Sequence, residues 1–221
     1  MSSLKISSLQ YITTRPEQAE IACSGGADWI QLRLKNQPYQ AWKAVALETL
    51  AVCRQYNARL IINDNPELAG EIGADGVHLG ADDMPVPEAR ALLGDAVIIG
   101  GTANTLETLL DLDQTGVDYV GLGPFRFTST KEKLSPILGL AGYQKILSSL
   151  LQLGVFVPVV AIGGITIADV PTLVSTGLSG VAVSSAISQS TDPAAETRLF
   201  IETVANLTNR TIAITPGTGR R

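Results

Sequence analysis

Short runs rich in valine, isoleucine and leucine alternate with longer amphipathic segments along almost the whole chain. Eight of these runs predict strands, near Gln10–Thr14, Trp29–Arg33, Arg59–Asn63, Gly76–Leu79, Val97–Gly100, Tyr119–Gly121, Val157–Ile162 and Val181–Val183. The segments between them predict helices over Pro16–Cys23, Tyr39–Tyr56, Pro66–Ile72, Pro85–Leu93, Thr105–Asp113, Gly142–Leu153 and Ile167–Ser175, with a last helix over Asp192–Ala205. Three of the helix starts carry an N-cap candidate, namely Asn65, Asn104 and Asp192.

Strands that alternate regularly with helices are typical of a parallel sheet. Eight such units in 221 residues favour closure into a (β/α)8 TIM barrel, and no G-x-G-x-x-G turn follows the first strand to support an open dinucleotide-binding sheet. We therefore expect a single-domain α/β barrel over residues 1–206 and a flexible C-terminal tail over the Thr- and Arg-rich residues 207–221. In such a barrel, functional residues lie at the carboxyl ends of the strands.

Composition narrows the classes of function. With 16 basic and 21 acidic residues, a net charge of −5 and a pI near 4.9, the chain does not resemble a nucleic-acid binder or a basic membrane-surface protein. One histidine excludes a multi-histidine zinc site, and Cys23 and Cys53 cannot form a disulfide framework. No signal-peptide core opens the chain, and Gly154–Ala168 is too short to span a membrane. We expect a cytoplasmic protein with no nucleic-acid or membrane partner, and a homodimer as its commonest form of self-association.

The second predicted strand alternates cleanly between apolar and polar residues. Ile30, Leu32 and Leu34 share one face, whereas Gln31, Arg33 and Lys35 share the other and would point into the barrel or its mouth. The alternative is an edge strand with one solvated face, but a closed barrel has no edge. Polar groups facing a packed interior are costly unless they are paired or bind a ligand, so this face predicts a binding site.

Carboxylates follow the third and fourth predicted strands. Asp64 comes after Asn63 at the end of the third strand, and Asp82 and Asp83 lie in the loop after the fourth. One or two carboxylates with water and substrate phosphates commonly hold Mg²⁺, so Asp64 with either Asp82 or Asp83 is a candidate metal site. Helix capping is the alternative for Asp64. His78, on the fourth strand, is expected to face inward as a hydrogen-bonded core residue, with a general-acid role as the alternative.

The last strands predict anion-binding groups. Thr128, Thr130 and Lys131 lie in a long segment after the sixth strand and suit a pyrophosphate, although a solvated loop or a closing lid would have a similar composition. Gly163-Gly164 and Ser184-Ser185 end the seventh and eighth strands, where barrels commonly bind phosphate, and Ser184–Gln189 would form the short extra helix. Two phosphate-binding zones and a metal site would suit an enzyme with two phosphorylated substrates.

These segments resemble the thiamin phosphate synthase family, also called thiamin-phosphate pyrophosphorylases. The resemblance rests on QLRLK (31–35), IINDNPELAGEIGADGVHLGADDMP (61–85), DYVGLGPFRFTSTK (118–131), PVVAIGGIT (158–166) and GVAVSSAI (180–187). It implies a (β/α)8 transferase of thiamin biosynthesis that requires Mg²⁺. The enzyme would join 4-amino-5-hydroxymethyl-2-methylpyrimidine pyrophosphate to 4-methyl-5-hydroxyethylthiazole phosphate and release pyrophosphate.

The resemblance also implies residue roles. The pyrimidine pyrophosphate would be held by Gln31, Arg33, Lys35, Asn63, Thr130 and Lys131, with Arg33, Thr130 and Lys131 counted as catalytic. The metal ligands would be Asp64 and Asp83. The thiazole phosphate would be held by Gly164, Ser184 and Ser185, with Thr128 between the substrates. His78 and Thr102 complete the expected substrate-binding set.

The implied mechanism is dissociative: the bond to pyrophosphate breaks, and the thiazole nitrogen captures a pyrimidine methyl cation. The chain departs from the family pattern in two places. Thr102 and Asn104 replace a Ser and a His, and Arg126-Phe127 replaces an aromatic–proline pair. Two alternatives follow. One is a thiazole tautomerase of the same superfamily, which relies on the histidine that Asn104 replaces. The other is a non-catalytic phosphate-binding barrel that senses thiamin precursors.

Overall fold

The computed structural model describes residues 6–127 and 136–214, with side chains as far as residue 207. Eight parallel strands form a closed barrel in sequence order, and the last strand pairs with the first. They are β1 (Leu9–Thr13), β2 (Trp29–Leu32), β3 (Arg59–Asn63), β4 (Gly76–Leu79), β5 (Ile98–Ala103), β6 (Tyr119–Leu122), β7 (Val159–Ile162) and β8 (Gly180–Val183). The prediction of a single-domain (β/α)8 TIM barrel is confirmed.

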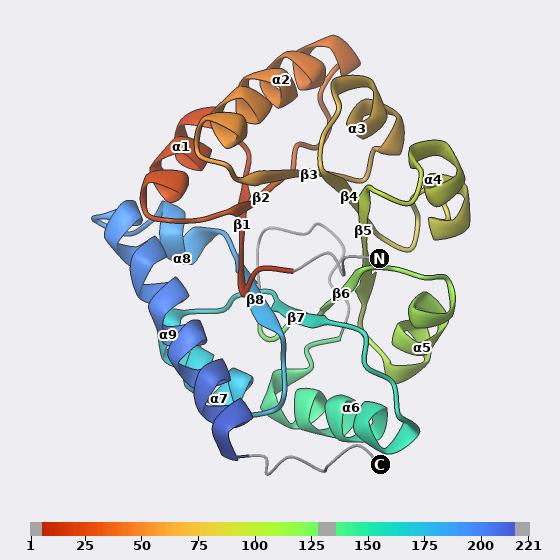
Figure 1. Ribbon diagram of the computed structural model, residues 1–221, viewed down its shortest axis with the longest axis vertical. Coiled ribbons are helices and arrows are strands. Elements are labelled where there is room, and N and C mark those ends of the chain that lie inside the picture. Colours follow the sequence, from red (N-terminus) through yellow and green to blue (C-terminus); the bar gives the residue numbers. More distant parts are fainter. Residues whose placement is uncertain (1–5, 128–135, 215–221) are drawn as a thin grey trace.

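Helices form an outer ring around these strands (Figure 1). They are α1 (Pro16–Ser24), α2 (Tyr39–Gln55), α3 (Pro66–Ile72), α4 (Val86–Leu93), α5 (Leu106–Gln114), α6 (Gly139–Leu153), the 3-10 turn η1 (Ile167–Asp169), α7 (Val170–Val174), α8 (Ser185–Ser188) and α9 (Pro193–Ile214). No helix within the two described ranges is long and apolar enough to cross a membrane.

Most predicted elements are present, and the differences have local causes. The helix predicted over Ile167–Ser175 divides into η1 and α7, because Thr166 and Asp169 form a capping box that closes a tight first turn. The last helix continues to Ile214, well past the predicted end at Ala205, so residues 207–214 are helical where a tail was expected. Residues 215–221 lie outside the described residues.

Two of the three predicted helix caps are confirmed. Asn65 accepts a hydrogen bond from the Leu68 amide at 2.8 Å, and Asp192 accepts one from the Ala195 amide at 2.9 Å. The prediction for Asn104 was wrong, because Thr105 caps α5 through its hydroxyl instead. The side chain of Asn104 is therefore available for another role.

The barrel wall separates two apolar cores because side chains alternate along each strand. Outward-facing residues such as Ile30, Leu60 and Val77 pack against the helix ring. The inward-facing core is small and consists of Trp29, Ile61, Ile98, Tyr119, Val160 and Ala182. The Trp29 and Tyr119 rings meet edge to face, with centroids 4.8 Å apart. Gly100 makes room for the Tyr119 ring, since a Cβ at Gly100 would overlap that ring.

The same three-residue pattern precedes each of the even-numbered strands. A glycine in the left-handed conformation ends the preceding helix, and a buried apolar residue and then a polar residue lead into the strand. The repeats are Gly26-Ala27-Asp28, Gly73-Ala74-Asp75, Gly116-Val117-Asp118 and Gly177-Leu178-Ser179. This repeat aligns each polar residue with the amino-terminal rim of the barrel.

Two of these aspartates each bond to a neighbouring strand and to an outer helix at the amino-terminal rim of the barrel, an arrangement here called a clasp. Asp118 Oδ2 accepts the Ile99 amide of β5 and pairs with Arg90 Nη2 of α4, both at 2.8 Å. Asp75 does the same one repeat earlier, with the Leu60 amide at 2.8 Å and Arg54 at 2.9 Å. Each clasp joins two strands to one outer helix.

Asp118→Ala is expected to lower the free energy of unfolding by about 1–3 kcal/mol, because it leaves the buried Ile99 amide without its acceptor. Urea unfolding followed by circular dichroism measures the loss. Asp95→Ala, an exposed residue in the loop before β5, is the control and should unfold like the parent chain. Equal stability of the two variants would contradict the clasp.

Candidate functional site

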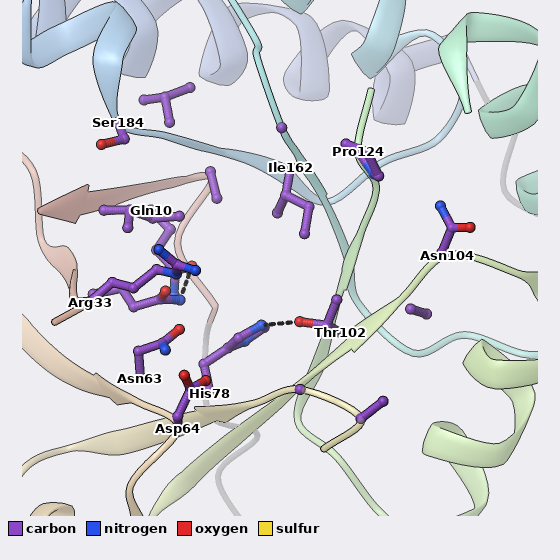
Figure 2. A pocket seen from close by; sticks show the side chains of 18 of the residues that line it. Gln10, Arg33, Asn63, Asp64, His78, Thr102, Asn104, Pro124, Ile162 and Ser184 are labelled. Carbon is purple, nitrogen blue, oxygen red and sulfur yellow. Dashed lines mark hydrogen bonds between the residues drawn. The ribbon is translucent and has the colours of Figure 1, made fainter. Parts of the chain in front are cut away.

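A cavity of about 610 Å³ lies at the carboxyl ends of the strands (Figure 2). Its described lining includes most of the residues expected from the sequence: Gln31, Arg33, Lys35, Asn63, Asp64, His78, Asp83, Thr102, Gly164, Ser184 and Ser185. Thr128, Thr130 and Lys131 lie outside the described residues. The structure therefore gathers, around one opening, groups from strands that are far apart in the chain.

The polar face of β2 points into the cavity as its alternation predicts. Gln31 is buried, with 2% of its surface exposed, and its Nε2 donates to Gln10 Oε1 at 3.0 Å. Further along, Arg33 and Lys35 line the mouth. The Lys35 ammonium lies 3.2 Å from Asp64 Oδ2, so it already neutralises part of the negative charge there. Because both partners are partly exposed, this ion pair contributes little to stability.

Asp64 belongs to the cavity and does not cap α3, since Asn65 performs that role. Its backbone adopts the left-handed conformation, with φ of 66°, at the point where the chain leaves β3. Such a conformation is uncommon for a residue other than glycine and clusters at functional sites. Its amide donates to the His78 carbonyl oxygen at 2.8 Å, which ties the turn to β4.

Asp83 is the second carboxylate of the site. Asp82 also lines the cavity but is exposed, and Asp83 is the one that contacts Asp64. The Gly80 amide donates to Asp83 Oδ2 at 2.6 Å and fixes the side chain. Burial, followed by a hydrogen-bond contact and charge repulsion with Asp64, raises the pKa of Asp83. Two neighbouring carboxylates of this kind suit a cation between them. Within the described residues, three or more His, Cys, Asp or Glu side chains do not gather at any one point to hold a metal.

Asn63 carries a donor that points to a ligand. Its side chain is 4% exposed and lines the cavity, and its Nδ2 has no hydrogen-bond partner among the described residues. A buried unsatisfied donor costs about 1–3 kcal/mol, so its presence beside an opening calls for an acceptor from outside the chain. A phosphate oxygen would supply one.

His78 faces inward, and both of its ring nitrogens have partners. Nδ1 lies 2.9 Å from Tyr119 Oη, and Nε2 lies 2.8 Å from Thr102 Oγ1. Tyr119 in turn receives a hydrogen bond from Gln10 Nε2 at 3.0 Å. The sequence analysis did not single out Gln10 or Tyr119. Gln10 could have been identified because it lies two positions before Ile12 and so shares the same face of the first strand. Tyr119 had the pattern of an ordinary core residue.

The corner formed by β7 and β8 is built on two glycines that pack closely against the segment after β6. Gly163 and Gly164 have φ of 93° and 66°, conformations that favour glycine. A Cβ on Gly164 would lie 2.5 Å from Arg126 Cγ and 2.8 Å from the Phe127 carbonyl oxygen. Opposite them, Ser184 precedes the short helix α8, which confirms the predicted helix after β8. Gly163, Gly164, Ser184 and Ser185 therefore line the cavity together at this corner.

The two departures from the family pattern both have structural roles. The Asn104 amide donates to the carbonyl oxygens of Gly123 at 2.9 Å and Pro136 at 2.8 Å. It therefore ties together the two ends of the segment that contains the expected pyrophosphate ligands. Arg126 pairs with Asp169 at 2.6 Å and lies over the Phe125 ring, 5.0 Å from its centroid. These contacts anchor the start of the same segment.

Comparisons with known proteins agree on one family. The family model described as thiamine monophosphate synthase matches residues 6–187. The thiamine-phosphate synthase of Bacteroides thetaiotaomicron is 51% identical over 200 residues, covering 88% of this chain and 96% of that protein. That of Flavobacterium johnsoniae is 53% identical over 169 residues, covering 76% and 80%.

A solved structure agrees with these sequences. The thiamine phosphate pyrophosphorylase from Pyrococcus furiosus has a TM-score of 0.79 at 32% identity. The match covers 90% of this chain and 96% of that one. Sequence and fold thus lead to the same group of enzymes.

Proposed function

Because the chain belongs to the thiamine monophosphate synthase family, and is therefore a transferase of thiamine biosynthesis, we propose that its cavity binds a pyrimidine pyrophosphate and a thiazole phosphate side by side. The observation that carries the proposal is the division of the mouth into two zones. Cationic and amide donors lie on β2 and β3, and a corner of glycines and serines lies between β7 and β8. The cytoplasmic location and the homodimer stay predictions from the sequence.

The pyrophosphate zone is built from Arg33, Lys35 and Asn63. Asn63 offers a donor that lacks a partner among the described residues, and Lys35 and Arg33 offer positive charge at the rim. Lys131 and Thr130 would join them from the segment whose ends Asn104 ties. A local cluster of this kind attracts a polyanion although the whole chain carries a net charge of −5.

The carboxylate pair fits Mg²⁺. Asp64 and Asp83 supply the hard oxygen ligands that this ion prefers, and the raised pKa of Asp83, caused by burial and then by Asp64, is what a pair awaiting a cation would show. When bound, Mg²⁺ would neutralise charge on the pyrophosphate leaving group. Lys35, 3.2 Å from Asp64, would then turn its ammonium toward the phosphates.

The chain's own residues act by positioning and by charge. As the carbon–oxygen bond to pyrophosphate breaks, Arg33, Lys35 and Lys131 stabilise the negative charge on the leaving group, while the pyrimidine amino group stabilises the methyl cation. Gly164, Ser184 and Ser185 hold the thiazole phosphate so that the ring nitrogen faces that carbon, and the family resemblance implies a place for Thr128 between the substrates. New C–N bond formation then completes the transfer without a protein nucleophile.

A coupled assay tests this function. Purified protein, both substrates and Mg²⁺ should yield pyrophosphate and thiamine phosphate in equal amounts. Isomerisation of the thiazole phosphate without the pyrimidine would instead support the tautomerase. Thiazole phosphate that binds without any turnover would support the precursor-sensing barrel.

Asp64→Ala and Lys131→Ala are each expected to lower turnover by more than roughly tenfold. The first removes a ligand of the proposed Mg²⁺ and the second removes a positive charge, and both positive charges would balance the leaving group. Initial rates of pyrophosphate release at saturating substrates measure the effect. Asp95→Ala and Lys145→Ala, two exposed charged residues outside the described cavity lining, are the controls and should keep near-normal rates. Normal rates in the first two variants would mean that the pyrophosphate binds elsewhere.

Gly164→Ala is expected to raise the KM for the thiazole phosphate by roughly tenfold, because the new methyl group displaces Arg126 and the corner that receives the phosphate. Steady-state kinetics with the pyrimidine pyrophosphate held saturating measure this change. Gly177→Ala is the control: it has the same kind of backbone strain, with φ of 96°, but open space around it and no place in the described cavity lining. It should lose stability and keep its KM. Equal KM values in the two variants would contradict this placement of the phosphate.

A further inference from the structure

Five side chains inside the barrel form one continuous series of hydrogen bonds, here called the interior chain. It consists of Gln31, Gln10, Tyr119, His78 and Thr102, joined in that order by contacts of 3.0, 3.0, 2.9 and 2.8 Å. The first four are buried, with at most 6% of their surface exposed, and Thr102 lies at the cavity. Figure 2 shows Gln10, His78 and Thr102 converging on the opening.

The donors and acceptors of the interior chain give it a direction. Gln10 presents its Oε1 to Gln31 Nε2 and its Nε2 to Tyr119 Oη, and an amide NH₂ group only donates. The phenol oxygen therefore accepts from Gln10. Its own single proton then goes to the other contact, His78 Nδ1, which must be unprotonated to receive it.

The state of Tyr119 supports this direction. Its ring is fully buried against Trp29, and burial raises the pKa of the phenol far above its usual range, so the hydroxyl keeps its proton and can donate. Buried polar groups are generally fully hydrogen-bonded, and a phenol proton with no acceptor here would be costly. His78 Nδ1 is the acceptor that the contacts provide.

The direction continues to the cavity. A neutral imidazole whose Nδ1 accepts carries its proton on Nε2, and that proton points to Thr102 Oγ1 at 2.8 Å. Since the Thr102 oxygen accepts from His78, its own hydroxyl proton is directed away from the ring. Thr102 is half-buried and lines the cavity, so a donor is offered there.

We propose that Gln10, Tyr119 and His78 are positioning residues that hold Thr102 as a hydrogen-bond donor toward an acceptor atom of the bound pyrimidine pyrophosphate. The substrate part of this statement rests on the proposed function, whereas the direction of the interior chain does not. Because side-chain amides can be turned end for end, the opposite direction is the alternative. In that case, Nδ1 would carry the proton and Thr102 would donate to His78.

The tautomer of His78 can be measured directly, because it is the one histidine of the 221 residues. Protein labelled with ¹⁵N-histidine and free of substrate should show a pyrrole-like Nε2 and a pyridine-like Nδ1 in long-range ¹H–¹⁵N spectra at neutral pH. A protonated Nδ1, whether in the other tautomer or in the imidazolium, would overturn the proposed direction. This result does not depend on which substrate the enzyme uses.

Variants connect the tautomer to binding. Tyr119→Phe should give a mixture of the two tautomers and weaken pyrimidine pyrophosphate binding by about two- to tenfold, as expected for one misdirected hydrogen bond. Tyr56→Phe, at the end of α2 outside the barrel, is the matched control and should change neither. Retention of the pure Nε2–H tautomer in Tyr119→Phe would overturn the role of Tyr119.

The hydroxyl of Thr102 is tested separately by calorimetry. Thr102→Val should weaken pyrimidine pyrophosphate binding at least as much as Tyr119→Phe, and Thr102→Ser should restore it. Both Thr102 variants should keep the Nε2–H tautomer, because Tyr119 still donates to Nδ1. Unchanged affinity in Thr102→Val would overturn the donor role at the cavity even where the tautomer agrees. A loss of affinity that Thr102→Ser does not restore would assign the effect to packing and overturn it equally.

Discussion

Closure of the barrel is the constraint on which the rest of this structure depends. It leaves inward-facing side chains without solvent except at the mouth, so polar groups there must bond to one another or to a ligand. The lower interior meets this condition with the apolar side chains of Ile61, Ile98 and Val160. Above them, the interior chain from Gln31 to Thr102 satisfies its members mutually. Asn63, at the opening, keeps one donor for a ligand.

Tyr119 joins these two layers. Its ring packs on Trp29 in the apolar core, and its hydroxyl lies between Gln10 and His78 in the interior chain. That position exists only because Gly100 on the neighbouring strand has no side chain. Through these contacts, packing at the centre of the barrel sets the orientation of polar groups at the mouth.

Residues at the amino-terminal ends of the strands stabilise the fold, whereas residues at the carboxyl ends line the candidate site. At the amino-terminal rim, Asp75 and Asp118 clasp strands to outer helices, while at the other end Asp64 and Asp83 face a cavity, where burial and then Asp64 raise the pKa of Asp83. The same residue type thus joins elements of the fold at one end and lines the candidate site at the other. Asn104 and Arg126, which depart from the family pattern, supply ties that hold the segment between β6 and α6 to the barrel.

The sequence by itself determined the order of strands and helices and the inward face of β2, because side-chain alternation and helical periodicity are local properties of the chain. It also predicted Asp64 and the glycine and serine corners, since these directly follow strands, whereas Asn63 was implied only by the family resemblance. The residues alone left Asp82 and Asp83 open, and the family resemblance favoured Asp83, whose contact with Asp64 the structure then shows. Only the tertiary structure decided that Asn104 ties a segment instead of capping a helix, and that α9 continues beyond Ala205. The hydrogen bond between Gln10 and Tyr119 could not be assigned from the sequence, because it joins residues 109 positions apart. Such a contact depends on the register of the closed barrel, which no local pattern encodes.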